Sequence, residues 1–217
     1  MSLSPQRGFP KRLNGRLNPM NTAPWITLKD GSDYDFTIPL SSRPPSVEVI
    51  AHSLSLLNRF AGHTHRPYSV AEHSCLCLEI ARRYWPEESD EFYLTVLCHD
   101  AAEAVTGDLA SPVKRVLGEP WRDFESRIEE HVLNGLYPGL FTSSVFNASA
   151  IKRVDLTALW IERRDMLVEH TRKWAVLDDP SFEPIPSRLK IPRKESHWSF
   201  WNGQFLYHFK TLAGPSA

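Results

Sequence analysis

The sequence has little cysteine and no long apolar segment. Cysteine occurs three times in 217 residues, as Cys75, Cys77 and Cys98, and an odd number without paired spacing argues against a disulfide framework. We therefore expect a reducing, cytoplasmic environment in which these cysteines act as small buried apolar side chains. No apolar run approaches the ~20 residues of a membrane-spanning helix. The N-terminus also lacks the apolar segment of a secretory signal.

The chain has almost no net charge, which excludes one class of partner. A formal charge of -1 gives no electrostatic reason to expect binding to nucleic acid. A small anionic substrate remains compatible, because it needs only a local basic pocket. The apolar fraction of 41% is ordinary for a soluble globular protein, and the length suits one substantial core. We expect a loose arm over residues 1–24, rich in Pro, Asn and Arg, and a single domain over 25–217.

Apolar spacing predicts a mainly α fold with a small N-terminal β-hairpin. The run WITLKDGSDYDFTI has two β-prone segments around a Lys-Asp-Gly-Ser turn. Helical periodicity then predicts a first helix that begins near Ser46 and ends at Arg59. Further helices are expected over 69–84, 90–107, 119–132 and 149–164. A Pro-rich connection, DDPSFEPIPSRLKIPRK, should precede a terminal helix in HWSFWNGQFLYHF, whose aromatic residues we interpret as core.

The segment Ser69-Val-Ala-Glu72 has the pattern of a helix capping box. Ser69 would be the N-cap and Glu72 the third helical residue, which gives Glu72 a structural role and makes it a poor catalytic candidate.

Four potential metal ligands fall on the inward faces of three predicted helices. His73 belongs to the helix after the capping box, His99 and Asp100 to the next, and Asp155 to the helix near residue 149. A buried carboxylate is costly unless it is paired or binds a metal. Two imidazoles and two carboxylates suit a divalent transition ion such as Zn, Co or Mn, with coordination positions left for water and a phosphate oxygen.

Two acidic residues and three cations flank these ligands in the sequence. Glu103 lies one helical turn after His99 and is a candidate to orient or deprotonate water. Its alternative role is structural: it would support the metal ligands without binding the metal, or pair two helices. Asp108 is a second candidate, with capping of the 109–116 turn as the alternative. Phosphate requires cations, and the candidates are Arg59, Lys114 and Lys152.

The motifs YSVAEHS, HDAAEAVTGDLASPVK and KRVDLTALWIERRD together resemble the HD-domain phosphohydrolases. The resemblance covers residues 25–170. It is strongest to bacterial 5′-deoxynucleotidases and to phage-type enzymes that include dATP triphosphohydrolases, and AHSLSLLNRFAGHTHRPYSVAEHS is closest to the phage type. It implies an HD-domain helical bundle that acts on a deoxynucleotide and forms homo-oligomers. Ala104 after Glu103 counts against an alarmone hydrolase, which has two acidic residues there.

The resemblance also implies roles for individual residues. The metal ligands would be His73, His99, Asp100 and Asp155, while Glu103 and Asp108 would handle the water or the leaving group. Arg59 would bind phosphate, and Phe60 and Ala61 would shape the nucleoside pocket.

Two reactions are compatible with these residues, and a third interpretation involves no catalysis. We expect a triphosphohydrolase that prefers dATP, in which metal-activated water attacks the α-phosphorus and releases deoxynucleoside and tripolyphosphate. A second divalent ion such as Mg would accompany the triphosphate. The alternative is a 5′-deoxynucleotidase that acts on deoxynucleoside monophosphates. A non-catalytic regulatory HD protein that binds nucleotide is the third interpretation.

Overall fold

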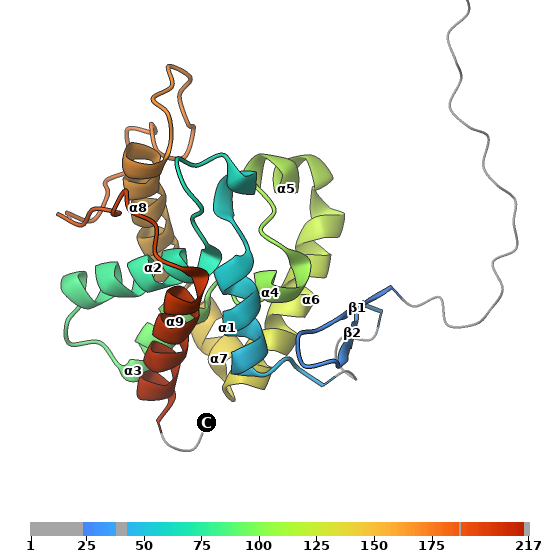
Figure 1. The fold of residues 1–217 in the computed structure, drawn as a ribbon. Coiled ribbons are helices and arrows are strands. Elements are labelled where there is room, and N and C mark those ends of the chain that lie inside the picture. The colour runs from blue at the N-terminus through green and yellow to red at the C-terminus, as the bar shows by residue number, and fades with distance from the viewer. Residues whose placement is uncertain (1–23, 38–42, 187, 215–217) are drawn as a thin grey trace, which may run out of the picture.

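A computed structural model describes residues 24–37, 43–186 and 188–214 (Figure 1). The predicted N-terminal arm lies outside these residues, apart from Pro24. Buried side chains from Leu28 to Leu212 form one apolar cluster, so the two ends of the described chain share a core. No helix in the described ranges combines the length and the apolar character needed to cross a membrane.

The predicted hairpin is confirmed. Strand β1 (Trp25–Thr27) pairs antiparallel with β2 (Asp33–Asp35), and Ile26 lies opposite Tyr34. Tyr34 is fully buried, and its hydroxyl lies 2.9 Å from Nδ1 of His131. This contact links the hairpin to helix α6 (Glu119–Leu136) and explains why so short a sheet holds its position.

The predicted mainly α fold is also confirmed. The helical elements are α1 (Val47–Leu56), η1 (Arg59–Gly62), α2 (Val70–Tyr84), α3 (Asp90–Cys98), α4 (Glu103–Thr106), α5 (Ser111–Leu117), α6 (Glu119–Leu136), α7 (Leu140–Phe146), α8 (Ala148–Met166) and α9 (Trp198–Ala213). Helices α1, α2 and α3 pack against α9, and α2 also packs against α8 (Figure 1). The predicted metal ligands lie on or next to α2, α3 and α8, so the candidate site lies where these three helices meet.

Serine side chains begin three of these helices. Ser46, Ser69 and Ser89 each accept a hydrogen bond from the backbone N–H three residues later, which satisfies an otherwise unpaired donor. The predicted cap at Ser69 is confirmed. The carboxylate of Glu72 accepts two hydrogen bonds from Arg66, so its role is structural, but it is an ion pair with Arg66 and not the carboxylate half of a capping box.

The prediction of one helix over residues 90–107 is wrong. Helix α3 ends at Cys98, and α4 starts at Glu103. Between them the chain tightens, because Ala101 N–H bonds to the Cys98 carbonyl and Glu103 N–H bonds to that of Asp100, each three residues back. Consecutive residues in an α-helix point about 100° apart. The His99 and Asp100 side chains nevertheless reach the same site, with 3.3 Å between Nε2 of His99 and Oδ2 of Asp100.

The prediction that Arg59 ends the first helix is also wrong. Helix α1 stops at Leu56, and Arg59 N–H bonds to the Tyr68 carbonyl at the start of η1. Phe60 and Ala61 then have φ angles of 57° and 49°, a left-handed conformation that is unfavourable for side chains other than glycine. This turn carries Arg59 away from α1 and towards α2 and α8.

Smaller differences occur at helix ends. Asn147, not Ser149, precedes α8, and α7 was not predicted. Ala110 precedes α5, so the alternative role of Asp108 as its cap is wrong. The terminal aromatic helix is confirmed as α9, with Phe205 and Phe209 buried, although Trp198, Phe200 and Tyr207 on the same helix are exposed.

Candidate metal centre

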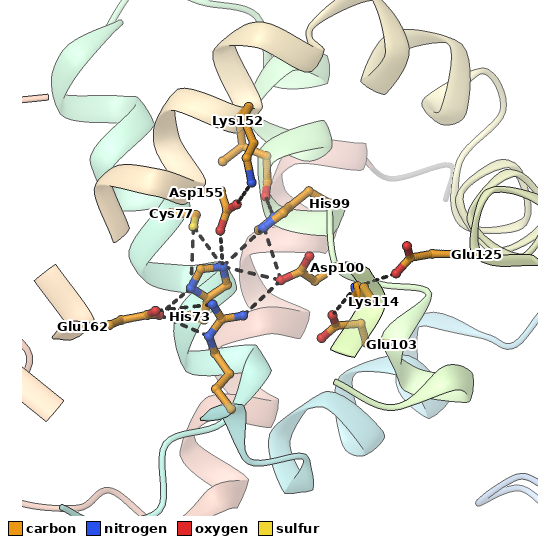
Figure 2. A network of polar contacts seen from close by, with 12 residues as sticks. His73, Cys77, His99, Asp100, Glu103, Lys114, Glu125, Lys152, Asp155 and Glu162 are labelled. Atoms are coloured by element: carbon orange, nitrogen blue, oxygen red, sulfur yellow. Dashed lines mark hydrogen bonds and ion pairs between the residues drawn. The ribbon is translucent and has the colours of Figure 1, made fainter. Parts of the chain in front are cut away.

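The four predicted ligands converge in space (Figure 2). Nε2 of His73 lies 3.3 Å from Nε2 of His99, 3.5 Å from Oδ2 of Asp100 and 3.6 Å from Oδ1 of Asp155. Nε2 of His99 lies 3.3 Å from the same Asp100 oxygen. Side chains from α2, from the turn after α3 and from α8 thus surround one small volume.

Hydrogen bonds on the far side of each imidazole set its orientation. His73 Nδ1 donates to Oε1 of Glu162 over 2.6 Å, and His99 Nδ1 donates to the carbonyl of Val96 over 2.8 Å. A carboxylate and a carbonyl are acceptors, so each Nδ1 carries a proton. In the neutral form of each ring, the Nε2 lone pair therefore points towards the other ring and the two aspartates, whereas in the protonated form Nε2 carries a positive charge and donates to a carboxylate.

With both rings neutral, four acceptor atoms face one another, and this arrangement favours a cation between them. Bonds of about 2.0–2.2 Å to a divalent ion place neighbouring ligand atoms roughly 3.0–3.6 Å apart. The separations here, 3.3 to 3.6 Å, agree with that geometry. His73, His99, Asp100 and Asp155 therefore fit a divalent transition ion by donor type, orientation and spacing.

The two aspartates are held in the charged form that a metal needs. Burial by itself raises the pKa of Asp100, but His99, His73 and Arg59 more than offset it and lower the pKa below its usual range. Burial acts in the same direction on Asp155, where His73 and Lys152 outweigh it and lower the pKa. Both carboxylates are therefore ionised at neutral pH.

Cys77 is a fifth potential donor beside His73. Its Sγ lies 3.4 Å from Nε2 of His73, and Cys77, His73 and His99 lie close enough together to hold an ion. Burial, followed by repulsion from Asp155, raises the pKa of this thiol well above its usual value. The thiol is therefore protonated where the aspartates are not, and the two-histidine, two-aspartate set is the better ligand set. Cys77 and Cys98 are buried as predicted, while Cys75 is half-buried.

Glu162 belongs to the centre but was not predicted as a site residue. It lies on α8 seven residues after Asp155, and its side chain is fully buried. Besides His73, it contacts Arg59, with 3.3 Å between Oε1 and the arginine Nε. Burial raises the pKa of Glu162, but Arg59 and His73 outweigh this effect and lower it. An inward carboxylate two turns from a ligand was the available sequence signal.

Glu103 and Asp108 are acids with a raised pKa. Burial is the main cause for Glu103, followed by repulsion from Asp100 and Asp108. Its Oε1 lies 3.6 Å from Nζ of Lys114, while its Oε2 is buried and has no hydrogen-bond partner within the described residues. Burial also raises the pKa of Asp108, although Arg59 acts in the opposite direction. Both acids hold a proton to higher pH than a free carboxyl group.

The three predicted cations lie near the centre, and each is paired with a carboxylate. Arg59 Nη1 lies 3.4 Å from Oδ2 of Asp100. Lys114 Nζ lies 2.5 Å from Oε1 of Glu125, and Lys152 Nζ lies 2.8 Å from Oδ2 of Asp155. The Lys152 side chain is 63% exposed, so it borders the site from the solvent side.

A cleft of about 430 Å³ lies beside the η1 turn. The Phe60 ring has its centroid 6.4 Å from that of Trp174, and Trp174 lines the cleft. The cleft walls come from the end of α8 and the following loop: Trp160, Arg163, Arg164, Leu167, Trp174 and Asp178. Ala61 is exposed on the turn and is in no described contact with the cleft.

Fold and site together define a mainly helical protein with a partly buried cluster of two histidines and two aspartates, whose donor types fit a divalent metal ion. No family model matches the sequence. The chain is 36% identical over 172 residues to YfdR of Escherichia coli (strain K12), covering 77% of this chain and 84% of YfdR. It is 33% identical over 144 residues to RCAP_rcc00048 of Rhodobacter capsulatus, covering 64% and 70%. Both relatives are described as uncharacterized. The chain belongs to the family of these two proteins.

Proposed function

We propose that this protein is a metal-dependent phosphohydrolase of the HD-domain class that acts on deoxynucleotides. The observation that carries the proposal is the convergence of His73, His99, Asp100 and Asp155, with their acceptor atoms facing one point. The raised pKa of Glu103, one turn away, adds a group that can transfer a proton.

Each flanking residue has a role that follows from its contacts. A bound divalent ion would polarise a phosphoryl oxygen and lower the pKa of a water molecule. Arg59 directs Nη1 at the centre and would bind a second phosphoryl oxygen. Burial raises the pKa of Glu103, so the group keeps its proton to higher pH than a free carboxyl group, which suits donation to the leaving oxygen. Asp108, half-buried beside it, would take part in the same proton transfer.

The pairing of the cations favours a monophosphate substrate. Arg59, Lys114 and Lys152 are each compensated by a carboxylate, so the site has little free positive charge. A deoxynucleoside monophosphate carries about two negative charges, which one divalent metal ion can balance. We therefore favour the 5′-deoxynucleotidase reaction.

A triphosphohydrolase that prefers dATP, as the sequence resemblance implies, is the second candidate. The observation that supports it is Lys152, whose partner Asp155 would bind the metal and so release the exposed ammonium group. Base and sugar of either substrate would lie against Phe60 and Trp174, beside the cleft.

A substrate panel tests the proposal. The purified protein, loaded with Co²⁺, Mn²⁺ or Zn²⁺, is incubated with deoxynucleoside and ribonucleoside mono- and triphosphates, and the products are identified. Orthophosphate from monophosphates supports the nucleotidase, and tripolyphosphate supports the triphosphohydrolase. The matched inactive control is Asp100→Asn. Tight nucleotide binding without turnover would contradict the enzyme and leave the regulatory interpretation.

A further inference from the structure

One buried carboxylate, that of Glu162, contacts both the candidate metal ligand His73 (Figure 2) and Arg59. Glu162 Oε1 accepts from His73 Nδ1 over 2.6 Å and lies 3.3 Å from Nε of Arg59. Its Oε2 accepts from Nη2 of Arg59, also over 3.3 Å. Glu162 thus contacts Arg59 through both oxygens and His73 through one.

This arrangement is not explained by stability alone. Glu162 is fully buried and the Arg59 side chain is 11% exposed, so both charges have lost most of their hydration. A buried ion pair recovers that loss only in part, and apolar residues of similar volume are often as stable. The contacts, by contrast, fix the orientation of two groups that face the centre.

We propose that Glu162 is a positioning residue that holds a metal ligand and the phosphate-binding arginine in one arrangement. The bond to Nδ1 keeps the proton on that nitrogen, so Nε2 of His73 faces the metal position. The contacts to Nε and Nη2 hold one edge of the Arg59 guanidinium, and Nη1 then points towards Asp100, 3.4 Å away. The role towards the metal stands without the proposed function, whereas the role towards phosphate rests on it.

The test is Glu162→Gln, studied by binding before any activity is measured. The uncharged amide is a weaker acceptor for His73, and one of its two polar atoms is an NH₂ group that repels Arg59. We expect the affinity for Co²⁺ to fall by about 10-fold to 100-fold, with a changed Co²⁺ absorption spectrum. At saturating Co²⁺, we expect affinity for inorganic phosphate to fall by roughly 10-fold, the loss of one charge-assisted contact.

Two further variants separate positioning from folding. Asp165→Asn removes an ion pair with Arg164 on the same helix, with no described contact to the centre, and should leave both affinities unchanged. Glu162→Asp keeps the charge but is one methylene shorter, so it cannot reach both partners. We expect it to lose affinity for either Co²⁺ or inorganic phosphate. If Glu162→Gln does not fold, the result for Glu162→Asp tests the proposal in its place.

Wild-type affinities for Co²⁺ and phosphate in folded Glu162→Gln, with only a lower melting temperature, would overturn the proposal. If the variant loses Co²⁺ affinity while the wild-type protein hydrolyses no nucleotide, the positioning role stands and the proposed function fails. If Co²⁺ affinity is lost and phosphate affinity is kept, the role towards Arg59 is wrong.

Discussion

Glu103 presents a buried carboxyl oxygen that has no hydrogen-bond partner in the described part of the chain. We predict that Glu103→Gln lowers kcat by about 10²-fold to 10⁴-fold, the usual contribution of a positioned proton donor. Because burial raises its pKa, the acid stays protonated to higher pH than a free carboxyl group, and the wild-type rate should fall as pH rises through that pKa. Glutamine cannot donate in this way, so the variant should lack this decline.

The measurement for Glu103 is a pH–rate profile of both proteins, with Co²⁺ affinity as the internal control. Glu103 is not among the four converging ligands, so Co²⁺ should bind the variant as it binds the wild type. An unchanged kcat, or a wild-type rate that rises over the same pH range, would count against proton donation.

Trp174 is the aromatic residue that would contact the nucleoside in the proposed reaction. Its ring lies beside Phe60 and also stacks on the guanidinium of Arg163, 5.7 Å from the centroid. Aromatic stacking on a base contributes about 1–3 kcal/mol, so Trp174→Ala should raise KM by roughly 10-fold with little change in kcat. Trp25→Ala, which removes an exposed tryptophan from the hairpin, is the matched control. Equal KM values in both variants would remove Trp174 from the substrate site.

At the scale of elements, helix α6 contains a carboxylate whose charge opposes folding. Burial, followed by repulsion from Glu125, raises the pKa of Glu129 to about 7. An unfolded glutamate titrates near ~4.3, so the folded protein binds more protons between that pH and 7. Stability therefore falls as pH rises through this window.

Replacing Glu129 by glutamine should remove this pH dependence. We expect Glu129→Gln to be more stable than the wild type at pH 8 by up to about 3 kcal/mol, the equivalent of the raised pKa. The two proteins should be equally stable near pH 4, where both side chains are uncharged. Denaturant unfolding at the two pH values is the measurement. A stability difference that does not change with pH would show that packing, not charge, is responsible.

Sequence periodicity predicted those elements whose buried face repeats regularly. Helix α2 follows a cap at Ser69 and turns His73 and Cys77 inward, as its apolar spacing indicates. The tight turn after Cys98 was not predictable, because no glycine or proline marks it, and Gly62 follows the left-handed pair Phe60-Ala61 without occupying either position. Contacts between separate segments maintain both: Arg59 N–H bonds to the Tyr68 carbonyl, and Ser53 Oγ donates to the Ala104 carbonyl. Local propensity does not encode such contacts.

At the scale of the molecule, residue type predicted the four metal ligands, but only the packing of the helices showed which residues hold those ligands in place. His73, His99, Asp100 and Asp155 were predicted because inward charged residues on apolar helix faces are costly. Glu162 lies 89 residues after His73, and no spacing rule links the two. The four ligands are also far apart in the sequence, so helices α2, α3 and α8 must assemble before the ligands meet. Metal binding therefore depends on folding.

Metal binding should therefore stabilise the whole fold. A ligand that binds the folded state alone adds about 2.7 kcal/mol at 100 times its Kd. For a chain of this size that corresponds to a rise of roughly 5–11 °C in Tm, which a chelator should reverse. Thermal unfolding with and without Co²⁺ measures it. Asp155→Asn removes one of two carboxylates that lie near the same imidazole nitrogen. The metal-free variant should therefore be at least as stable as the wild type, while most of the gain with Co²⁺ is lost. A full gain in the variant would mean that the ion binds elsewhere, and that these four acceptors are not its site.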